Sequence, residues 1–233
     1  MTGCEVRDDG SAYLVRPSEP SGAAVLFLHW FDPPEVNSDR TEFLAEAVRL
    51  AGRGVRSLLP QQAFPWSGDP VGDDRDRATI ETELTRLGAA LDTLAAGPGV
   101  DRIAVVGHDY GAMYGAVLAA RDPRVRALAA LAPDASWSTW FQAFWLTLPD
   151  PDPYAALFAD LEPVDAVGRV AADRPVLLQF ADDDFYVPEA VRDRFREAAP
   201  TATTTVHPKA GHRLDLAALT VRTRWLAEVL RLP

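Results

Sequence analysis

The sequence predicts an α/β fold in which a mostly parallel sheet is flanked by helices on both faces. Three observations predict it: short, fully apolar segments, longer segments of helical character between them, and glycine or proline at the junctions. Strands without polar alternation are typical of a parallel sheet that is buried on both faces. Right-handed crossovers then place the connecting helices on both sides of the sheet.

Seven segments are expected to form strands, and the first of them is expected at an edge. In chain order they are Ser11–Arg16, Ala24–His29, Val55–Leu59, Arg102–Val106, Val125–Ala132, Pro175–Phe180 and Ala202–His207. In open sheets of this class, ligands bind beyond the carboxyl ends of the strands. A functional site is therefore sought among the residues that directly follow each strand.

Five segments between the strands are expected to be helices. They are Ser38–Ala51, Asp73–Ala96, Tyr110–Ala120, Val187–Ala199 and Leu214–Leu230. The longest of them shows the pattern clearly, because isoleucine and leucine recur on one stripe until Gly97-Pro98-Gly99 ends it.

The segment 135–172 interrupts the alternation of strands and helices and is rich in aromatic residues. Trp137, Phe141, Phe144 and Trp145 recur there at helical spacing. We expect a small lid on a single domain that spans residues 1–233. Packing of the lid onto the body is the favoured interpretation for most of these rings. The sharper interpretation is an apolar substrate pocket, lined by His29, Trp30, Trp66, Trp137, Trp140 and Phe141.

Composition and charge exclude several classes of protein. The net charge of −11 disfavours a nucleic-acid partner, because phosphate binding needs clustered lysine and arginine. The apolar runs are too short to span a membrane, and the first ten residues carry charges where a signal peptide needs an apolar core. Cys4 is the single cysteine, so a reducing, cytoplasmic location is expected. Nucleotide and metal motifs are missing from the sequence, so neither a cofactor nor a metal is expected.

The strongest motif is Gly107-His108-Asp109-Tyr110-Gly111, between a predicted strand and a predicted helix. This spacing is typical of a nucleophile elbow, a sharp strand-to-helix turn with the reactive side chain at its centre. The alternative is that Asp109 only caps the helix that follows it. Capping alone does not require the two flanking glycines.

At this motif the sequence resembles the α/β-hydrolase fold superfamily, and the resemblance covers nearly the whole chain. The central residue of that family's elbow is normally serine. An aspartate there is similar to the haloalkane dehalogenases and epoxide hydrolases, whereas the compact size and small lid are similar to the dienelactone hydrolases. The resemblance implies a catalytic acid and a histidine later in the chain.

Both partners are found in the expected order. His212 follows the last predicted strand, as the catalytic histidine of the family does. Asp184 has the register of the family's acid, after the strand at Pro175–Phe180. Asp182 and Asp183 are rivals for that role, and so is Asp134, which follows the strand at Val125–Ala132.

The resemblance also implies an oxyanion hole made of two backbone N–H groups. Tyr110 should supply one, because it directly follows the nucleophile, and Phe31 should supply the other. Trp30 stands where the family usually has glycine. Its indole could line the floor of the site or donate from its ring N–H, and ordinary core packing is equally favoured.

The chemistry of a carboxylate nucleophile favours one reaction class. Attack of Asp109 on a saturated carbon forms an alkyl ester that water then hydrolyses, which suits epoxides and C–halogen bonds in a small apolar substrate. One alternative is an ester or lactone hydrolase of the dienelactone hydrolase type. The other is a binding protein without catalytic activity, since fold does not fix function.

Overall fold

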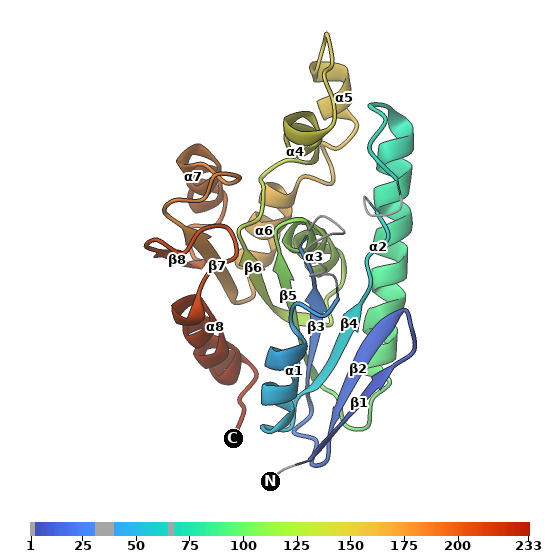
Figure 1. The fold of residues 1–233 in the computed structure, drawn as a ribbon, viewed down its shortest axis with the longest axis vertical. Coiled ribbons are helices and arrows are strands. Elements are labelled where there is room, and N and C mark those ends of the chain that lie inside the picture. The colour runs from blue at the N-terminus through green and yellow to red at the C-terminus, as the bar shows by residue number, and fades with distance from the viewer. Residues whose placement is uncertain (1–2, 31–39, 65–67) are drawn as a thin grey trace.

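The computed structural model describes residues 3–30, 40–64 and 68–233. Within these residues eight strands form one sheet in the order β1-β2-β4-β3-β5-β6-β7-β8 (Figure 1). Their bounds are β1 (Cys4–Asp8), β2 (Ala12–Pro17), β3 (Ala23–Leu28), β4 (Arg56–Pro60), β5 (Arg102–His108), β6 (Val125–Leu131), β7 (Val176–Ala181) and β8 (Thr203–His207). Only the pairs β1–β2 and β2–β4 are antiparallel. The predicted fold class is confirmed.

The sequence prediction missed strand β1. Its residues are mostly charged and exposed, with Glu5, Arg7 and Asp8 among five positions, so they show no apolar run. Backbone pairing with β2 holds them in the sheet, from Cys4 opposite Pro17 to Asp8 opposite Tyr13. Charged side chains are usual on an edge strand, where they hinder pairing with another chain.

Helices cover both faces of the sheet. Their bounds are α1 (Leu44–Ala51), α2 (Asp74–Ala95), α3 (Tyr110–Arg121), α4 (Trp137–Phe144), α5 (Asp152–Ala156), α6 (Pro163–Ala171), α7 (Glu189–Ala198) and α8 (Leu216–Val229). Side chains of α1 and α8 share one apolar cluster with one face of the sheet, whereas α2, α3, α6 and α7 share the cluster on the opposite face. Helix α1 is shorter than predicted, because Arg40–Phe43 form a turn and positions 38 and 39 lie outside the described residues.

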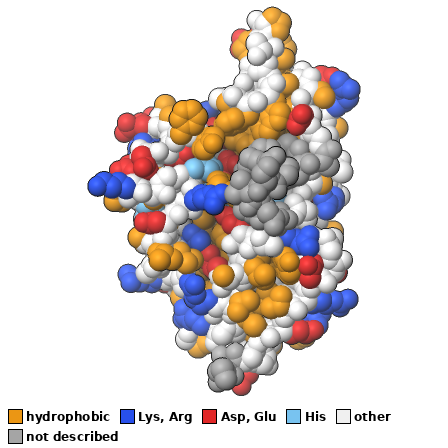
Figure 2. All heavy atoms as spheres, in the orientation of Figure 1, with side chains coloured by type: hydrophobic (Ala, Val, Ile, Leu, Met, Phe, Trp, Pro, Cys, Tyr) orange, Lys and Arg blue, Asp and Glu red, His pale blue; other side chains and the backbone are white. Residues whose placement is uncertain are grey.

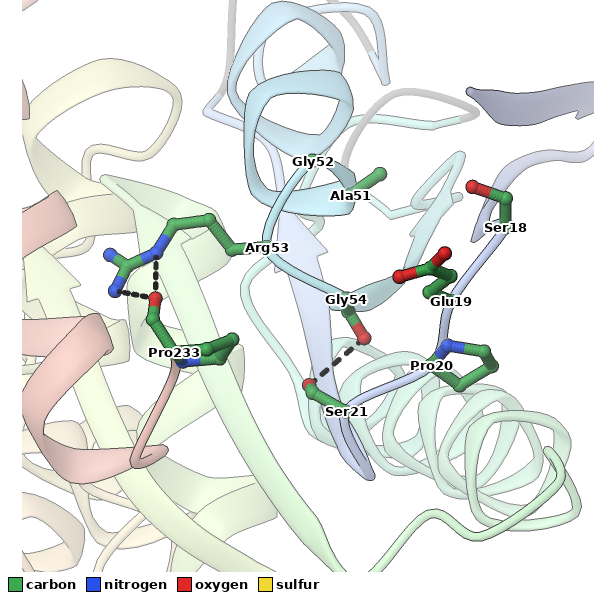
Figure 3. A pocket seen from close by; sticks show the side chains of 9 residues that line it. All are labelled: Ser18, Glu19, Pro20, Ser21, Ala51, Gly52, Arg53, Gly54 and Pro233. Carbon is green, nitrogen blue, oxygen red and sulfur yellow. Dashed lines mark hydrogen bonds between the residues drawn. The ribbon is translucent and has the colours of Figure 1, made fainter. Parts of the chain in front are cut away.

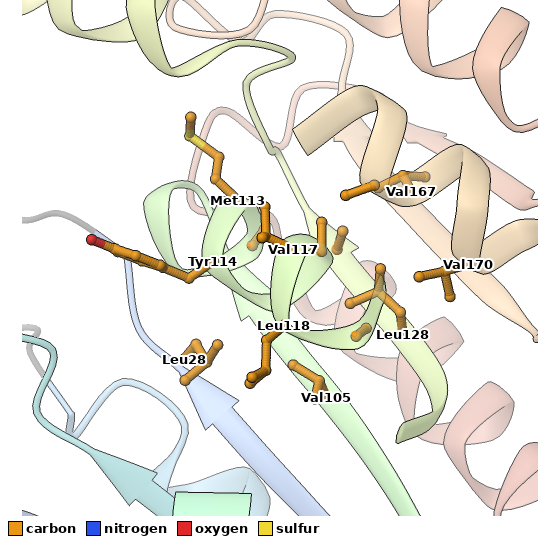
Figure 4. Close-up of a cluster of buried hydrophobic side chains, with 14 of the residues drawn as sticks. Leu28, Val105, Met113, Tyr114, Val117, Leu118, Leu128, Val167 and Val170 are labelled. Carbon is orange, nitrogen blue, oxygen red and sulfur yellow. The ribbon is translucent and has the colours of Figure 1, made fainter. Parts of the chain in front are cut away.

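Helix α3 is the most deeply buried helix and sits at the centre of the larger cluster. Figure 4 shows Val117 and Leu118 of α3 beside Val105 and Leu128 of the sheet. Valines of α6 close the other side of the helix. The helix that begins at the predicted elbow is therefore fixed by packing along its whole length.

The segment 135–172 divides into two parts. Helix α6 packs against α3 and α7 and so belongs to the helical layer. Helices α4 and α5 rise above the sheet (Figure 1). Side chains of α2 tie this raised part to the body: the Tyr154 hydroxyl donates to Asp76 Oδ2 at 2.6 Å, and Arg77 donates to Leu157 O. Within the segment, Trp137 Nε1 donates to Leu161 O at 2.8 Å.

A hollow of about 250 Å³ lies at the amino ends of β3 and β4 (Figure 3). Arg53 donates there to the carbonyl oxygen of Pro233, and Ser21 donates to that of Gly54. This is the edge of the sheet opposite to the one where sites are expected in this fold class. No helix among residues 3–30, 40–64 and 68–233 is long and apolar enough to cross a membrane.

Candidate active site

Asp109 lies on a sharp turn between β5 and α3. Its φ of 50° and ψ of −117° place it in the left-handed half of backbone space, which is strained for a residue other than glycine. The turn is held by a hydrogen bond of 2.7 Å from the Asp109 N–H to Leu131 O. This geometry is that of a nucleophile elbow.

The two flanking glycines are required by close backbone approach. A Cβ on Gly107 would lie 2.4 Å from Gly111 O, and a Cβ on Gly111 would lie 2.3 Å from Leu28 O. Neither backbone oxygen can move without breaking the turn or the end of β3. The glycines thus allow α3 to begin directly against the sheet.

The Asp109 carboxylate does not cap α3. The side chain makes no capping hydrogen bond to the first turn of the helix, although Asp109 is the N-cap residue. Capping was the alternative explanation for an aspartate at this position. The carboxylate faces His212 instead, with 3.8 Å between Oδ1 and the histidine Nε2.

His212 lies between two carboxylates. Its Nδ1 is 2.9 Å from Asp184 Oδ2, and its Nε2 faces Asp109. All three side chains are almost inaccessible, with exposed fractions of 9% for His212, 6% for Asp109 and 0% for Asp184. Burial acts to lower the pKa of His212, but the two carboxylates outweigh it and raise that pKa to about 9. The histidine is therefore an imidazolium at neutral pH.

The three consecutive aspartates have separate contacts. Asp182 accepts a hydrogen bond from the Lys209 N–H and Asp183 accepts one from the Gly211 N–H, so both hold the loop that carries His212. Asp184 alone pairs with the histidine ring. Burial acts to raise the pKa of Asp184, but the His212 hydrogen bond and two backbone amides outweigh it and lower that pKa.

Asp134 lies near Asp109 rather than against His212. It accepts a hydrogen bond of 3.0 Å from the Ser136 N–H at the start of α4. Burial raises the pKa of Asp134 to about 6, and the negative charge of Asp109 acts in the same direction. Of the four candidates for the acid, Asp184 is the one whose carboxylate pairs with the His212 ring, and Asp109 faces the other ring nitrogen.

Glu42 and His108 form a hydrogen-bond network next to the site. Glu42 Oε1 is 2.6 Å from His108 Nδ1, and Glu42 Oε2 accepts a hydrogen bond of 2.9 Å from the Trp30 N–H. His108 Nε2 is 2.9 Å from the carbonyl oxygen of His212. Glu42 therefore connects the end of β3, the elbow and the histidine loop.

Comparisons with known proteins agree with this geometry at the level of fold. No protein-family model and no curated protein matches the chain. Among solved structures, Est1E from Butyrivibrio proteoclasticus is 20% identical over 98% of this chain and 99% of that one, with a TM-score of 0.71. The esterase domain of a Rhodothermus marinus protein is 17% identical over 100% and 98% of the two chains, with a TM-score of 0.64. A candidate dienelactone hydrolase from Klebsiella pneumoniae is 18% identical over 98% of both chains, with a TM-score of 0.66.

The chain has the α/β-hydrolase fold. The predicted resemblance is confirmed at this level. Tyr110 is the first residue of α3 and directly follows Asp109. Its N–H therefore lies in the first turn of the helix, where the helix dipole favours negative charge. Phe31 was predicted to supply the second oxyanion N–H and lies outside the described residues, so that role stays a prediction.

The predicted pocket residues differ in what they contact. Trp137 and Phe141 are fully buried, and His29 is 1% exposed, with its ring bonded to backbone groups of Trp30 and Gln62. These three residues hold the body together. Trp66 lies outside the described residues. Trp30 packs against the site itself, as its stacked contacts with His108 and His212 show.

A continuous series of rings runs from the elbow to the histidine. Ring centroids are 4.5 Å apart for Tyr110 and Trp140, 5.3 Å for Trp140 and Phe144, 5.7 Å for Phe144 and Tyr186, and 4.9 Å for Tyr186 and His212. We call these residues the aromatic arc. Phe144 and Tyr186 are half exposed at its mouth. On the face in Figure 2, hydrophobic side chains gather at the raised segment and border a small patch of histidine surface.

Sequence reasoning identified neither Glu42 nor His108 as part of the site. Glu42 lies in no motif, and only the fold brings it to Trp30 and His108. Sequence reasoning also missed Tyr186, whose ring lies against that of His212. The hydroxyl of Tyr154 donates to Asp76 instead.

Proposed function

We propose that this α/β-hydrolase hydrolyses an apolar carboxylic ester or lactone, with Asp109, His212 and Asp184 as its catalytic residues. The observation that carries the proposal is the arrangement of Asp109, His212 and Asp184 at the elbow, with both histidine nitrogens facing a carboxylate. The similar folds of an esterase domain and of a candidate dienelactone hydrolase favour ester chemistry over the C–halogen or epoxide chemistry expected from the aspartate alone.

In the first step the Asp109 carboxylate is the nucleophile and the His212 imidazolium is the acid. Asp109 attacks the ester carbonyl carbon, and the bond to the alcohol oxygen breaks after the tetrahedral intermediate forms. The His212 imidazolium gives its Nε2 proton to the leaving oxygen, so that alcohol and an acyl-Asp109 anhydride result. The N–H of Tyr110 would stabilise the oxyanion. A carboxylate nucleophile needs no base to activate it.

The second step uses the same histidine as a base. Acylation removes the negative charge of Asp109, which is one of the two charges that favour the imidazolium. Neutral His212 then accepts a proton from water as the water oxygen attacks the acyl carbon. The products are the free acid and the ionised Asp109, and the histidine is again charged. Asp184 orients the ring throughout.

The aromatic arc supports an apolar substrate. Trp140, Phe144 and Tyr186 form a wall that reaches from the elbow to His212, and such walls are typical of pockets for apolar ligands. A structure of Est1E contains bound ferulic acid. An aromatic acyl group would suit the rings present here.

A second candidate function is hydrolysis of a C–halogen bond or an epoxide. The observation that favours it is the carboxylate at the elbow, because carboxylates attack saturated carbon readily. The product of that attack is an alkyl ester of Asp109. Water then attacks the Asp109 carbonyl carbon, so repeated turnover in ¹⁸O-water would label this carboxylate.

A substrate panel tests both functions. It contains aryl and alkyl esters, lactones, haloalkanes and epoxides, and acid, halide and diol are measured as products. We expect acid from esters or lactones, with a loss of at least about 100-fold in Asp109→Asn and in His212→Gln. Asp182→Asn is the matched control, because it removes the same charge while its amide oxygen can still accept from Lys209.

Three outcomes would contradict the ester proposal. The first is the absence of acid from every ester and lactone with the unmodified chain. The second is full ester turnover in Asp109→Asn. The third is halide or diol formation together with ¹⁸O in Asp109, which would assign the second candidate function instead.

A further inference from the structure

The indole of Trp30 contacts three groups that carry or can carry a positive charge. Its ring centroid lies 5.1 Å from that of His108 and 5.5 Å from that of His212, with interplanar angles of 7° and 27°. The guanidinium carbon of Arg213 lies 4.7 Å from the centre of the indole. The face of an indole is the strongest aromatic partner for a cation.

Both ring nitrogens of His108 are held by hydrogen-bond partners. Its Nδ1 faces Glu42 Oε1 at 2.6 Å, and its Nε2 faces the carbonyl oxygen of His212 at 2.9 Å. Both ring nitrogens thus face acceptors, and a neutral imidazole carries only one N–H. These two contacts fix the plane of the His108 ring on which the indole stacks.

His212 carries its positive charge in an environment that both favours and opposes it. Asp109 and Asp184 favour the charge, whereas burial opposes it. The ring centroid of His108 lies 5.3 Å from that of His212, and Arg213 follows His212 in the chain. Glu42 Oε1 lies 2.6 Å from His108 Nδ1. The ring of Tyr186 also contacts that of His212. The indole is the group that contacts His108, His212 and Arg213 at once.

We propose that Trp30 is a positioning residue that keeps His212 as an imidazolium directed at Asp109. Its ring face stabilises the cation, and the Glu42 carboxylate fixes the Trp30 backbone on which this contact depends. Trp30 stands where the family usually has glycine, and Asp109 stands where it usually has serine. His212 links these two departures, because it contacts both residues. A hydroxyl or thiol nucleophile needs a neutral histidine to take its proton, whereas a carboxylate does not. The consequence for turnover rests on the proposed ester hydrolysis, but the charge state of His212 does not.

The charge state of His212 can be measured without any substrate. We would follow the imidazole ¹³C and ¹⁵N resonances of the intact chain against pH, with His212→Gln to assign the signal among the four histidines. In Trp30→Leu, the midpoint of the His212 titration should fall by about one pH unit. In Trp30→Phe, which keeps a ring face, the midpoint should fall by less than half as much. An unchanged midpoint in a folded Trp30→Leu protein would overturn the proposal.

A second measurement covers the case in which Trp30→Leu does not fold. Fluorinated tryptophan has nearly the same shape, but its ring face is a weaker partner for a cation. Its incorporation at every tryptophan should lower the midpoint of the His212 titration in the chain that has Trp30, and should leave that midpoint unchanged in Trp30→Phe. The Trp30→Phe control removes the contribution of the other tryptophans. Equal effects in both proteins, or no effect in either, would overturn the proposal.

The pH dependence of ester hydrolysis then separates this proposal from the proposed function. If both hold, the alkaline limb of the kcat profile shifts with the His212 midpoint in each Trp30 variant. If the midpoint shifts and no ester is hydrolysed, the ester function fails while the role of Trp30 stands. If turnover falls and the midpoint does not move, Trp30 has only a structural role and the inference is wrong.

Discussion

His212 Nδ1 lies 2.9 Å from Asp184 Oδ2, across 28 residues of sequence. The side chain of Asp184 is fully buried, and its other contacts are the amides of Tyr186 and Val187. Because one carboxylate both fixes the orientation of the imidazole and stabilises its charge, loss of that charge should affect the site in two ways.

We expect Asp184→Asn to lower kcat for the proposed reaction by about 100-fold to 10,000-fold, since an amide cannot stabilise the imidazolium and favours the wrong tautomer. Initial rates over a range of pH would measure this. Asp183→Asn is the matched control, because its amide oxygen can still accept from the Gly211 N–H. A similar loss of kcat in both variants would indicate a general effect of the loop rather than a role for Asp184.

The stability of the fold should depend on pH through His212. Its pKa is about 9 in the folded chain, against an ordinary value of 6.5. The folded state therefore binds the proton more tightly than the unfolded state. The resulting stabilisation is complete below about pH 6.5 and is lost as the pH rises through about 9, with a magnitude on the order of 3 kcal/mol. Urea unfolding between pH 6 and 10 would measure it. His212→Gln should flatten this dependence, and a dependence of unchanged size in the variant would contradict the assignment.

Alanine at either elbow glycine should destabilise the fold strongly. The added Cβ of Gly111→Ala would meet the backbone of β3 at 2.3 Å, a separation that no side-chain movement can relieve. We expect a loss of more than about 3 kcal/mol, or no folded protein. Thermal or urea unfolding would measure the loss. Gly88→Ala in α2 has no heavy atom within 4 Å of the new Cβ and should stabilise the chain by about 0.5–1 kcal/mol.

Two aromatic residues on α4 should respond differently to substitution. Trp137 is fully buried and bonded to Leu161 O, so Trp137→Phe should lower the free energy of unfolding by about 1–3 kcal/mol. Phe144 is 42% exposed at the mouth of the aromatic arc. Phe144→Ala should change stability little and raise KM for apolar esters by about 3-fold to 30-fold. A loss of stability in Phe144→Ala as large as that in Trp137→Phe would show that Phe144 is a packing residue instead.

The sequence was sufficient to predict the features that depend on local pattern. The apolar strands, the helices between them and the glycines on both sides of Asp109 are visible within short windows. The structure has them close to the expected positions, although α1 is shorter than expected. The fold class followed from this alternation. Strand β1 was missed because its charged residues are held by pairing with β2 rather than by burial.

The rest depended on contacts between distant segments. Three adjacent aspartates were available, and only the path of the loop at 209–212 decides which of them faces the histidine ring. Glu42 has no local signal, because its partners lie on β5 and at the end of β3. The orientation of the Trp30 ring could not be decided from sequence for the same reason.

The raised segment containing α4 and α5 begins and ends at parts of the chain that are fixed in the body. It leaves the sheet after β6 and returns at α6, which packs against α3 and α7. Trp137 and Phe141 of α4 pack on α3, so α4 is fixed as well. The length of the chain between α4 and α5 can change without moving the elbow, the histidine loop or the order of the strands, since surface insertions carry only a small entropic cost. Evolution or an engineer could thus vary this connection and give the same reactive groups a different choice of substrate.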